Sequence, residues 1–243
     1  MKKMICKNYD ALSYLAANII AEQIKNKPDT VLGLATGSTP MGTYKELVRR
    51  NKKGAVDFSG VTTFNLDEYY KISGDNPQSY HYFMYRNLFD HININRNNIH
   101  IPDGNTASVE QECERYDRLI RDAGGIDLQV LGIGSNGHIG FNEPASELIT
   151  KTHLTALTEN TIQDNARFFN HADEVPVHAI TMGLGTILKA KRIILLISGK
   201  NKAEIFKKAF EGKITTNLPA SLLQLHPDTT VIVDEEAAFK LVS

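Results

Sequence analysis

The feature that most restricts how this chain can fold is a repeated alternation of short apolar runs and longer amphipathic stretches. The apolar runs are nearly continuous, which is typical of strands buried on both faces of a sheet, and they occupy residues 30–35, 61–66, 127–133, 178–182, 192–198 and 229–233. Stretches with helical periodicity lie between them, at residues 10–25, 40–50, 79–89, 109–123, 201–210 and 235–242. This alternation predicts an α/β fold, a three-layer, doubly wound and mainly parallel sheet of Rossmann-like type with helices on both faces.

The chain carries no pattern that indicates a second domain, an export signal or a membrane anchor. No internal repeat, low-complexity tract or Pro/Ser-rich linker interrupts the alternation, so we expect a single domain over residues 1–243. Cys6 and Cys113 are far apart in the sequence and give neither a disulfide framework nor the spacing of a metal site. At the N-terminus, charge interrupts every short apolar run, so there is no signal-peptide core, and no stretch elsewhere reaches transmembrane length. We therefore expect a cytoplasmic protein.

Because positive and negative charges nearly balance in this chain, any bound anion must be held by groups at its own binding site. The 27 Lys and Arg residues are offset by 28 Asp and Glu residues, for a net charge of −1. Such a chain has no overall field to hold nucleic acid or an anionic membrane, and we expect neither as a partner. In open α/β sheets, ligands bind at the carboxyl ends of the strands, which directs attention to the loops at residues 36–40, 67–70, 134–144 and 198–202.

The first of these loops, Ala-Thr-Gly-Ser-Thr-Pro at residues 35–40, has the features of an anion site at a helix start. Gly37 can adopt a positive φ, Ser38 or Thr39 can cap the helix, and Pro40 suits its first turn. Free N–H groups together with these hydroxyls could hold an anion without a positive side chain. The same residues also fit an ordinary capped helix, and the Gly-Lys-Ser/Thr ending of a Walker A motif is absent.

The second loop places two acids at the end of a predicted strand, in Phe-Asn-Leu-Asp-Glu-Tyr at residues 64–69. Burial at the mouth of the strand would raise the pKa of Asp67 toward that of a useful general base. The alternative is that Asp67 or Glu68 only caps the following turn. Both interpretations stay open from these residues alone.

The third loop, residues 131–144, is the strongest indication of a catalytic site. Four glycines between residues 132 and 140 allow close approach of a ligand to the backbone, and His138 among them can transfer a proton near neutral pH. Glu143, five residues later, could orient the His138 ring. The Gly-x-Gly-x-x-Gly spacing also imitates a dinucleotide fingerprint, but it falls in mid-chain and Gly-Phe-Asn-Glu-Pro does not begin a helix. These residues favour a catalytic loop with no dinucleotide cofactor.

Taken together, the motifs resemble those of glucosamine-6-phosphate deaminases. The matching segments are Thr-Gly-Ser-Thr-Pro at 36–40, Asn-Leu-Asp-Glu-Tyr at 65–69, Gly-Ile-Gly-Ser-Asn-Gly-His-Ile-Gly-Phe-Asn-Glu-Pro at 132–144, Ala-Arg-Phe-Phe around Arg167, and the later Ser-Gly-Lys-Asn-Lys-Ala and Pro-Ala-Ser-Leu-Leu-Gln. The resemblance covers essentially the whole chain in order. It implies an enzyme of amino-sugar catabolism that converts glucosamine 6-phosphate and water to fructose 6-phosphate and ammonia, without a metal or an organic cofactor.

The resemblance also implies a role for each residue of the site. Asp67 is the implied base that moves a proton from C2 to C1 of the sugar. His138 is the implied ring-opening acid and base, with Glu143 holding its tautomer and Asn136 assisting. The implied binding site for the substrate phosphate consists of Gly37, Ser38, Thr39, Arg167 and Lys202.

The sequence departs from the family pattern at two places. Some members carry Asp where this chain has Asn136, which leaves Glu143 to support His138 largely unaided. The allosterically activated hexameric members carry basic residues where this chain has His153 and Thr155, and they are longer at the C-terminus. The chain thus resembles the shorter, unregulated members, and we do not expect activation by N-acetylglucosamine 6-phosphate. We expect a monomer or a small homo-oligomer.

Two other functions share this type of fold. A 6-phosphogluconolactonase has a related Gly-x-Gly-x-x-Gly-His loop, but a lactone hydrolase would not need Asp67 as a carbon base. A sugar-phosphate-sensing domain of a transcription regulator is preceded by a DNA-binding helix-turn-helix. Here the first predicted strand begins near residue 30 and leaves room for one helix only, and the neutral net charge also argues against DNA binding.

Overall fold

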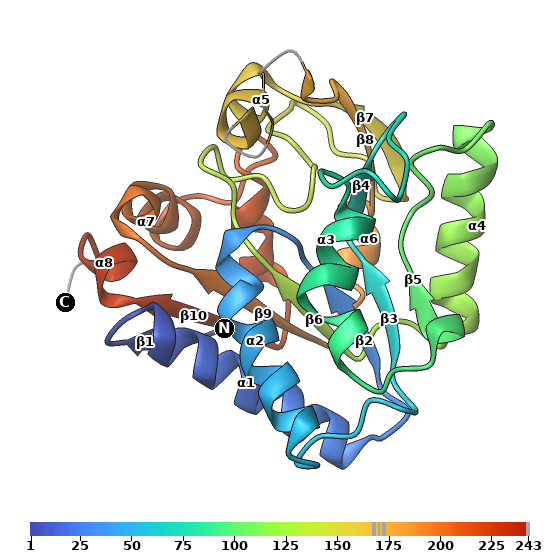
Figure 1. Ribbon diagram of the computed structural model, residues 1–243. Helices are drawn as coiled ribbons and strands as arrows, with labels where there is room; N and C mark the ends of the chain where they lie inside the picture. Colours follow the sequence, from blue (N-terminus) through green and yellow to red (C-terminus); the bar gives the residue numbers. More distant parts are fainter. Residues whose placement is uncertain (167–168, 170, 172–173, 242–243) are drawn as a thin grey trace.

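The computed structural model describes residues 1–166, 169, 171 and 174–241. Its central sheet has seven strands in the spatial order β1-β10-β9-β6-β2-β3-β5, and all of its neighbouring strands run parallel (Figure 1). The strands are β1 (Lys2–Cys6), β2 (Val31–Leu34), β3 (Thr62–Asn65), β5 (Ile99–His100), β6 (Leu128–Leu131), β9 (Arg192–Ile197) and β10 (Thr229–Asp234). The predicted α/β class with a mainly parallel sheet is confirmed.

Helices cover both faces of this sheet and complete the three predicted layers. One face carries α1 (Tyr9–Asn26), α2 (Ser38–Lys52), α3 (Tyr80–Asn87) and the short 3₁₀ helix η1 (Phe89–His91). The other carries α4 (Val109–Asp122), α6 (Leu184–Ile187), α7 (Ala203–Glu211), α8 (Glu235–Ala238) and the 3₁₀ helix η5 (Pro219–Leu225). Alternate residues of β9 belong to the two apolar clusters, Ile193 and Leu195 to one and Ile194 and Leu196 to the other. This double burial explains why the strand reads as a continuous apolar run.

A second, antiparallel sheet lies above the carboxyl ends of the parallel strands, at the top of Figure 1, next to α5 (Glu159–Ala166). Its strands are β4 (Asp67–Tyr69), β8 (His178–Thr181) and β7 (His153–Ala156), in that spatial order. The prediction that residues 178–182 form a strand of the parallel sheet is therefore wrong. Because an apolar run indicates burial and does not specify a partner, it could not tell one sheet from the other.

The N-terminal segment also differs from expectation. The prediction that the first strand begins near residue 30 is wrong, because β1 pairs in parallel with β10 at the edge of the sheet. Most of β1 is exposed, so it lacks the apolar run of the inner strands. Among the other predicted elements, the helix at 235–242 is shorter than expected, since α8 ends at Ala238. No described helix combines the length and apolarity needed to cross a membrane.

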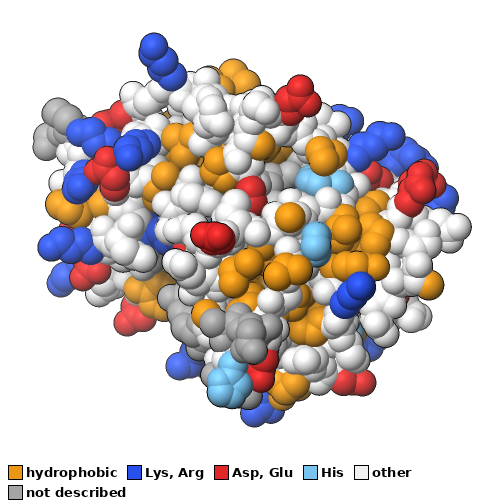
Figure 2. All heavy atoms as spheres, turned by 90° about the horizontal axis from the view of Figure 1, so that it is seen from above, with side chains coloured by type: hydrophobic (Ala, Val, Ile, Leu, Met, Phe, Trp, Pro, Cys, Tyr) orange, Lys and Arg blue, Asp and Glu red, His pale blue; other side chains and the backbone are white. Residues whose placement is uncertain are grey.

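The path of the chain brings two glycine-containing loops together. From β2 the chain moves outward to β3 and β5, and it then returns to β6, which pairs with the other side of β2. The loops after β2 and β6 therefore start side by side where the strand order reverses, the usual ligand position in such sheets. Figure 2 views this end of the molecule from above, with Lys and Arg side chains scattered around its edge and apolar or uncharged surface over much of the middle.

Candidate active site

A pocket opens where the loops after β2 and β6 meet. The predicted site residues that line it are Gly37, Ser38, Thr39, Asp67, His138 and Lys202. Asn136 and Glu143 are hydrogen-bonded to each other beside His138 and support it. Arg167 lies outside the described residues. The sequence therefore identified residues that come from four separate loops and meet at one place.

The start of α2 forms one wall of the pocket. Gly37 is its N-cap, with φ 98°, and forms no side-chain cap hydrogen bond; a residue with a Cβ would be strained there. The prediction that Ser38 or Thr39 caps the helix is wrong, because both lie in its first turn, followed by Pro40. The positive end of the helix dipole and the N–H groups of this turn are thus directed toward the pocket, and they can bind an anion.

Lys202 brings a positive charge to the same wall. It ends the 3₁₀ helix η4 (Lys200–Lys202), which follows β9 and leads into α7. Asp234 at the end of β10 holds the beginning of this loop, because it accepts hydrogen bonds from the Ser198 hydroxyl at 2.5 Å and from the Gly199 N–H at 3.1 Å. The strand ends therefore fix the backbone from which Lys202 projects, and an ammonium group suits a phosphate ligand as a point charge.

The second wall carries the predicted pair of acids. Asp67 begins β4, faces the pocket, and is 5% exposed. Burial, and secondarily the charge of neighbouring Glu68, raises the pKa of Asp67 to about 8. A carboxyl group with this proton affinity can both take and return a proton near neutral pH.

Glu68 has a different role from its neighbour. Its carboxylate accepts hydrogen bonds from the N–H groups of Tyr69, Tyr80 and His81, at 2.7–2.9 Å. Tyr80 and His81 are the first residues of α3, so Glu68 satisfies donors at the start of that helix. Burial raises the pKa of Glu68 to about 7, although these hydrogen bonds oppose the rise. Each of the two interpretations of this loop thus applies to one of its acids. Glu68 binds the start of a helix, and Asp67 faces the pocket.

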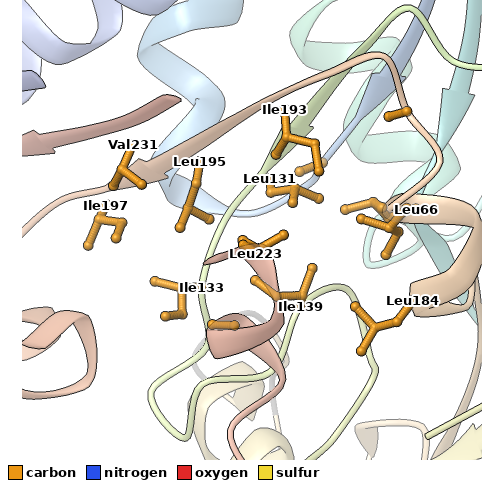
Figure 3. Close-up of a cluster of buried hydrophobic side chains, with 14 of the residues drawn as sticks. Leu66, Leu131, Ile133, Ile139, Leu184, Ile193, Leu195, Ile197, Leu223 and Val231 are labelled. Carbon is orange, nitrogen blue, oxygen red and sulfur yellow. The ribbon is translucent and has the colours of Figure 1, made fainter. Parts of the chain in front are cut away.

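The third wall is the loop after β6, which places His138 over a glycine. A Cβ on Gly134 would lie 2.3 Å from Cε1 of the His138 ring, so only glycine leaves room for the imidazole. The side-chain oxygen of Asn136 accepts a hydrogen bond of 3.1 Å from the backbone N–H of His138. Ile133 and Ile139 anchor the two ends of this turn in the apolar core, where their side chains lie near Leu223 (Figure 3). The loop that carries His138 is therefore packed into the core on both sides of the histidine.

Glu143 lies against the His138 ring and is itself surrounded by donors. Its Oε2 is 3.4 Å from Nδ1 of His138 and accepts a hydrogen bond of 2.7 Å from the amide of Asn136. Burial alone would raise the pKa of Glu143, but hydrogen bonding and charge from His138, with hydrogen bonds from Thr161 and Asn136, outweigh it and lower the pKa to about 2. An ionised Glu143 favours the tautomer with hydrogen on Nδ1, which leaves Nε2 as an acceptor.

Sequence reasoning missed several residues that line the pocket. Thr161, Asp164 and Asn165 come from α5, and the aromatic rings of Tyr80 and Phe141 stack with centroids 5.8 Å apart. Thr158, which precedes α5 and accepts the N–H of Thr161 at 3.3 Å, is a helix-start signal that could have revealed α5. The predicted phosphate ligand Arg167 directly follows this helix in the sequence, and it was the one signal that could have indicated that α5 reaches the pocket. Among the described residues, no group of three or more His, Cys, Asp or Glu side chains is arranged to hold a metal ion.

Comparison with known proteins accords with this geometry. Residues 7–232 match the family model described as glucosamine-6-phosphate isomerases/6-phosphogluconolactonase. The chain belongs to this family. A curated glucosamine-6-phosphate deaminase of Thermoanaerobacter pseudethanolicus is 60% identical over 98% of this chain and 94% of its own length. Another, of Clostridium perfringens, is 57% identical over 98% of both chains.

Solved structures extend the comparison. A structure described as that of a monomeric glucosamine-6-phosphate deaminase is 51% identical, with a TM-score of 0.96 over 98% of this chain and 99% of that one. A 6-phosphogluconolactonase of Thermotoga maritima has a TM-score of 0.76 at 22% identity, over 96% of this chain and 99% of that one. The second likeness is one of fold alone, so the choice between the two activities depends on the site and on the close relatives.

Proposed function

We propose that this chain is a glucosamine-6-phosphate deaminase, which converts glucosamine 6-phosphate and water to fructose 6-phosphate and ammonia. The observation that carries the proposal is the buried carboxyl of Asp67, with its raised pKa, in a pocket that also contains an anion site and the His138–Glu143 pair. The names of the relatives at 57–60% identity support the same activity. Each of the three parts serves a separate step.

The phosphate of the substrate binds at the start of α2, where the N–H groups and hydroxyls of Ser38 and Thr39 meet it together with the ammonium group of Lys202. Arg167, outside the described residues, is proposed as a further phosphate ligand, because a guanidinium can grip phosphate through two hydrogen bonds. An anchored phosphate holds the sugar so that its first two carbons meet the catalytic groups. Such positioning is itself a large part of catalysis.

His138 opens the pyranose ring. Opening requires a proton to leave the C1 hydroxyl and a proton to reach the ring oxygen, and a neutral imidazole can perform both transfers. The Glu143 carboxylate beside Nδ1 keeps that nitrogen protonated, so the transfers use Nε2. Glu143 also stabilises the imidazolium that exists between the two transfers.

Asp67 then acts on the open-chain aldehyde. Its carboxylate removes the C2 proton and returns it to C1. The oxygen on C1 takes up a proton as the amino nitrogen on C2 gives one up, so C1 becomes a hydroxyl-bearing CH₂ group and C2 becomes an imine. Water adds to C2, and the C2–N bond breaks to give the ketone and ammonia. Atoms balance with water as the only co-reactant. We propose that the reaction uses no metal and no organic cofactor.

The lactonase alternative fits the site less well. Hydrolysis of a lactone breaks a carbon–oxygen bond and moves no proton between carbons, so it leaves Asp67 without a use. Burying Asp67 to 5% exposure beside a second buried carboxyl group costs stability, which is expected where the carboxyl group has a function. The deaminase reaction accounts for this residue.

The wider setting follows from the same features. We propose a single domain that works in the cytoplasm as a monomer or a small homo-oligomer, on a small-molecule substrate and not on nucleic acid. The described cysteines, Cys6 and Cys113, are free and buried, and one structural relative is described as monomeric. Light scattering after size-exclusion chromatography measures the oligomeric state directly.

One assay tests the activity. The purified protein is mixed with glucosamine 6-phosphate, and ammonia and fructose 6-phosphate are measured by separate coupled enzymes. We expect equal amounts of both products, and little turnover of glucosamine, which lacks the phosphate. Hydrolysis of 6-phosphogluconolactone without ammonia release from the amino sugar would overturn the proposal in favour of the lactonase.

A further inference from the structure

The hydroxyl of Thr161 on α5 reaches into the pair formed by His138 and Glu143. It donates a hydrogen bond of 2.5 Å to Oε1 of Glu143 and lies 3.4 Å from Nδ1 of His138. Thr161 is 1% exposed, so water does not compete freely for these contacts. Thr158 holds the hydroxyl in place, because its own hydroxyl donates to Thr161 Oγ1 at 3.2 Å. The threonine is therefore a fixed donor directed at a carboxylate.

This donor completes the hydrogen bonding of the Glu143 carboxylate. Asn136 and His138 both approach Oε2, at 2.7 and 3.4 Å, whereas Thr161 approaches Oε1. With donors on both oxygens, the carboxylate plane cannot rotate without the loss of a charge-assisted hydrogen bond. The amide of Asn136 constrains one oxygen only. Thr161 supplies the second constraint from a different part of the chain.

A second contact between α5 and the same loop is independent of this pair. The Ser135 hydroxyl donates to Asp164 at 2.5 Å and accepts from the amide of Asn160 at 2.7 Å. These hydrogen bonds also join α5 to the loop, but none of them reaches His138 or Glu143. The structure thus contains two contacts of similar type, one at the catalytic pair and one beside it.

We propose that Thr161 is a positioning residue, which aligns the Glu143 carboxylate with His138 through its hydroxyl and so makes the ring-opening acid and base depend on α5. This inference rests on the proposed deaminase function. It assigns to α5 a part in the chemical step, in addition to its place in the pocket wall. Loss of the hydroxyl should therefore affect turnover more than substrate binding.

The test compares three variants by steady-state kinetics with glucosamine 6-phosphate. Thr161→Val keeps the shape of the side chain but removes the donor, and we expect kcat to fall about 10- to 100-fold, the loss of one hydrogen bond to a charged group, while KM changes by less than about threefold. Thr161→Ser restores the hydroxyl, and its kcat should return to within about threefold of the wild type. Ser135→Ala is the matched control, and its kcat should stay within about twofold.

A spectroscopic measurement makes the inference independent of the assay. In protein labelled with nitrogen-15 histidine, the His138 ring, assigned by comparison with His138→Gln, should have its hydrogen on Nδ1 in the wild type and in Thr161→Ser. In Thr161→Val the two tautomers should mix. If the valine variant does not fold, Thr161→Ala takes its place in both measurements.

The outcomes separate the inference from the proposed function. A wild-type protein that releases no ammonia contradicts the proposed function, and the tautomer measurement then decides the role of Thr161. A folded Thr161→Val with the kcat of Ser135→Ala and an unchanged tautomer overturns the inference. A Thr161→Ser variant that stays as slow as valine also overturns it, because the hydroxyl is then not the group that matters.

Discussion

Asp67 and Glu143 are two carboxyl groups at one pocket whose proton affinities are shifted in opposite directions. Burial raises the pKa of Asp67 to about 8, with a contribution from the Glu68 charge. The pKa of Glu143 falls to about 2, because its donors outweigh the effect of burial. The β4 end of the site therefore holds an acid that can exchange a proton near neutral pH, and the loop after β6 holds one that stays ionised.

The difference teaches that burial raises the pKa of a carboxyl group unless hydrogen-bond donors and positive charge around it outweigh the effect. The side chain of Glu143 is 8% exposed and receives hydrogen bonds on both oxygens. Asp67 is more deeply buried, receives no such set of donors from the described residues, and has another acid as its nearest charged neighbour in sequence. Two carboxyl groups whose environments separate their pKa values are a common sign of a division between proton transfer and charge stabilisation.

The largest effect should come from Asp67→Asn. Asparagine keeps the shape of the side chain but cannot accept a proton, so ammonia release should fall about 10⁴-fold or more, at or beyond the upper end for general-base catalysis. In D₂O, NMR should detect no deuterium entering the hexose. Binding of glucosaminitol 6-phosphate, an open-chain analogue, should persist because the phosphate site is intact. Normal exchange in this variant would transfer the role of carbon base to His138 or Glu143.

His138→Ala should produce the next largest effect. If His138 only opens the ring, the small fraction of substrate that opens spontaneously can still react at Asp67. Turnover should fall about 10²- to 10⁴-fold and should then be limited by the rate of uncatalysed opening, measured separately by NMR exchange between the anomers. A variant whose residual rate is far below the uncatalysed opening rate would require a further role for His138 after opening.

The sequence predicted the parts of the site that are local and left out those that depend on folding. Gly37, Asp67 and His138 follow buried strands, and the rule for ligand positions in α/β sheets is enough to predict that their loops meet. Thr161 lies on a short helix whose hydrogen bonds reach Ser135 and Glu143, distant in sequence. The edge strand β1 was missed for a related reason, because its role comes from pairing with β10 and not from its own composition.

The opposite pKa shifts should also produce opposite effects on stability. The folded pKa of Asp67, about 8, lies above its ordinary value of 3.8, so the folded state holds this proton longer than the unfolded state and the stability of the wild type falls as pH rises between these values. An asparagine side chain at this position does not titrate. We therefore expect Asp67→Asn to gain stability relative to the wild type as pH rises from about 5 to 9, measured by urea unfolding.

Glu143→Gln should behave in the opposite way. The folded pKa of about 2 lies below the ordinary value of 4.5, so the ionised group contributes stability above pH 4.5 that is lost as pH falls toward 2. At pH 7 the variant should be about 1.5–3 kcal/mol less stable than the wild type, the range for hydrogen bonds to a charged group. The deficit should shrink in acid. If both variants shift stability in the same direction at pH 7 and above, the contrast between the two carboxyl groups is wrong.

The smallest effect, and the most specific, should come from Glu68→Gln. Because Asp67 must be ionised to act as a base, log kcat/KM should rise with pH up to about 8 and then level off. Removal of the Glu68 charge removes one cause of the raised pKa, so this acid limb should move to lower pH while most activity remains. The buried hydroxyls of Tyr69, Tyr80 and Tyr116 do not contribute to this acid limb. Burial raises the pKa of each hydroxyl above its ordinary value, so they stay protonated in this pH range.

Glu112→Gln is the matched control for this measurement. Glu112 is also buried, at 5% exposure, and accepts a backbone N–H, that of Asp103 at 2.8 Å, but it is not among the residues that line the pocket. Its substitution should leave the acid limb in place. If Glu68→Gln also leaves the limb unmoved while the protein stays folded, the charge of Glu68 does not act on Asp67. Burial alone would then set the pKa of the base, and the contrast with Glu143 would depend entirely on the donors around that second carboxylate.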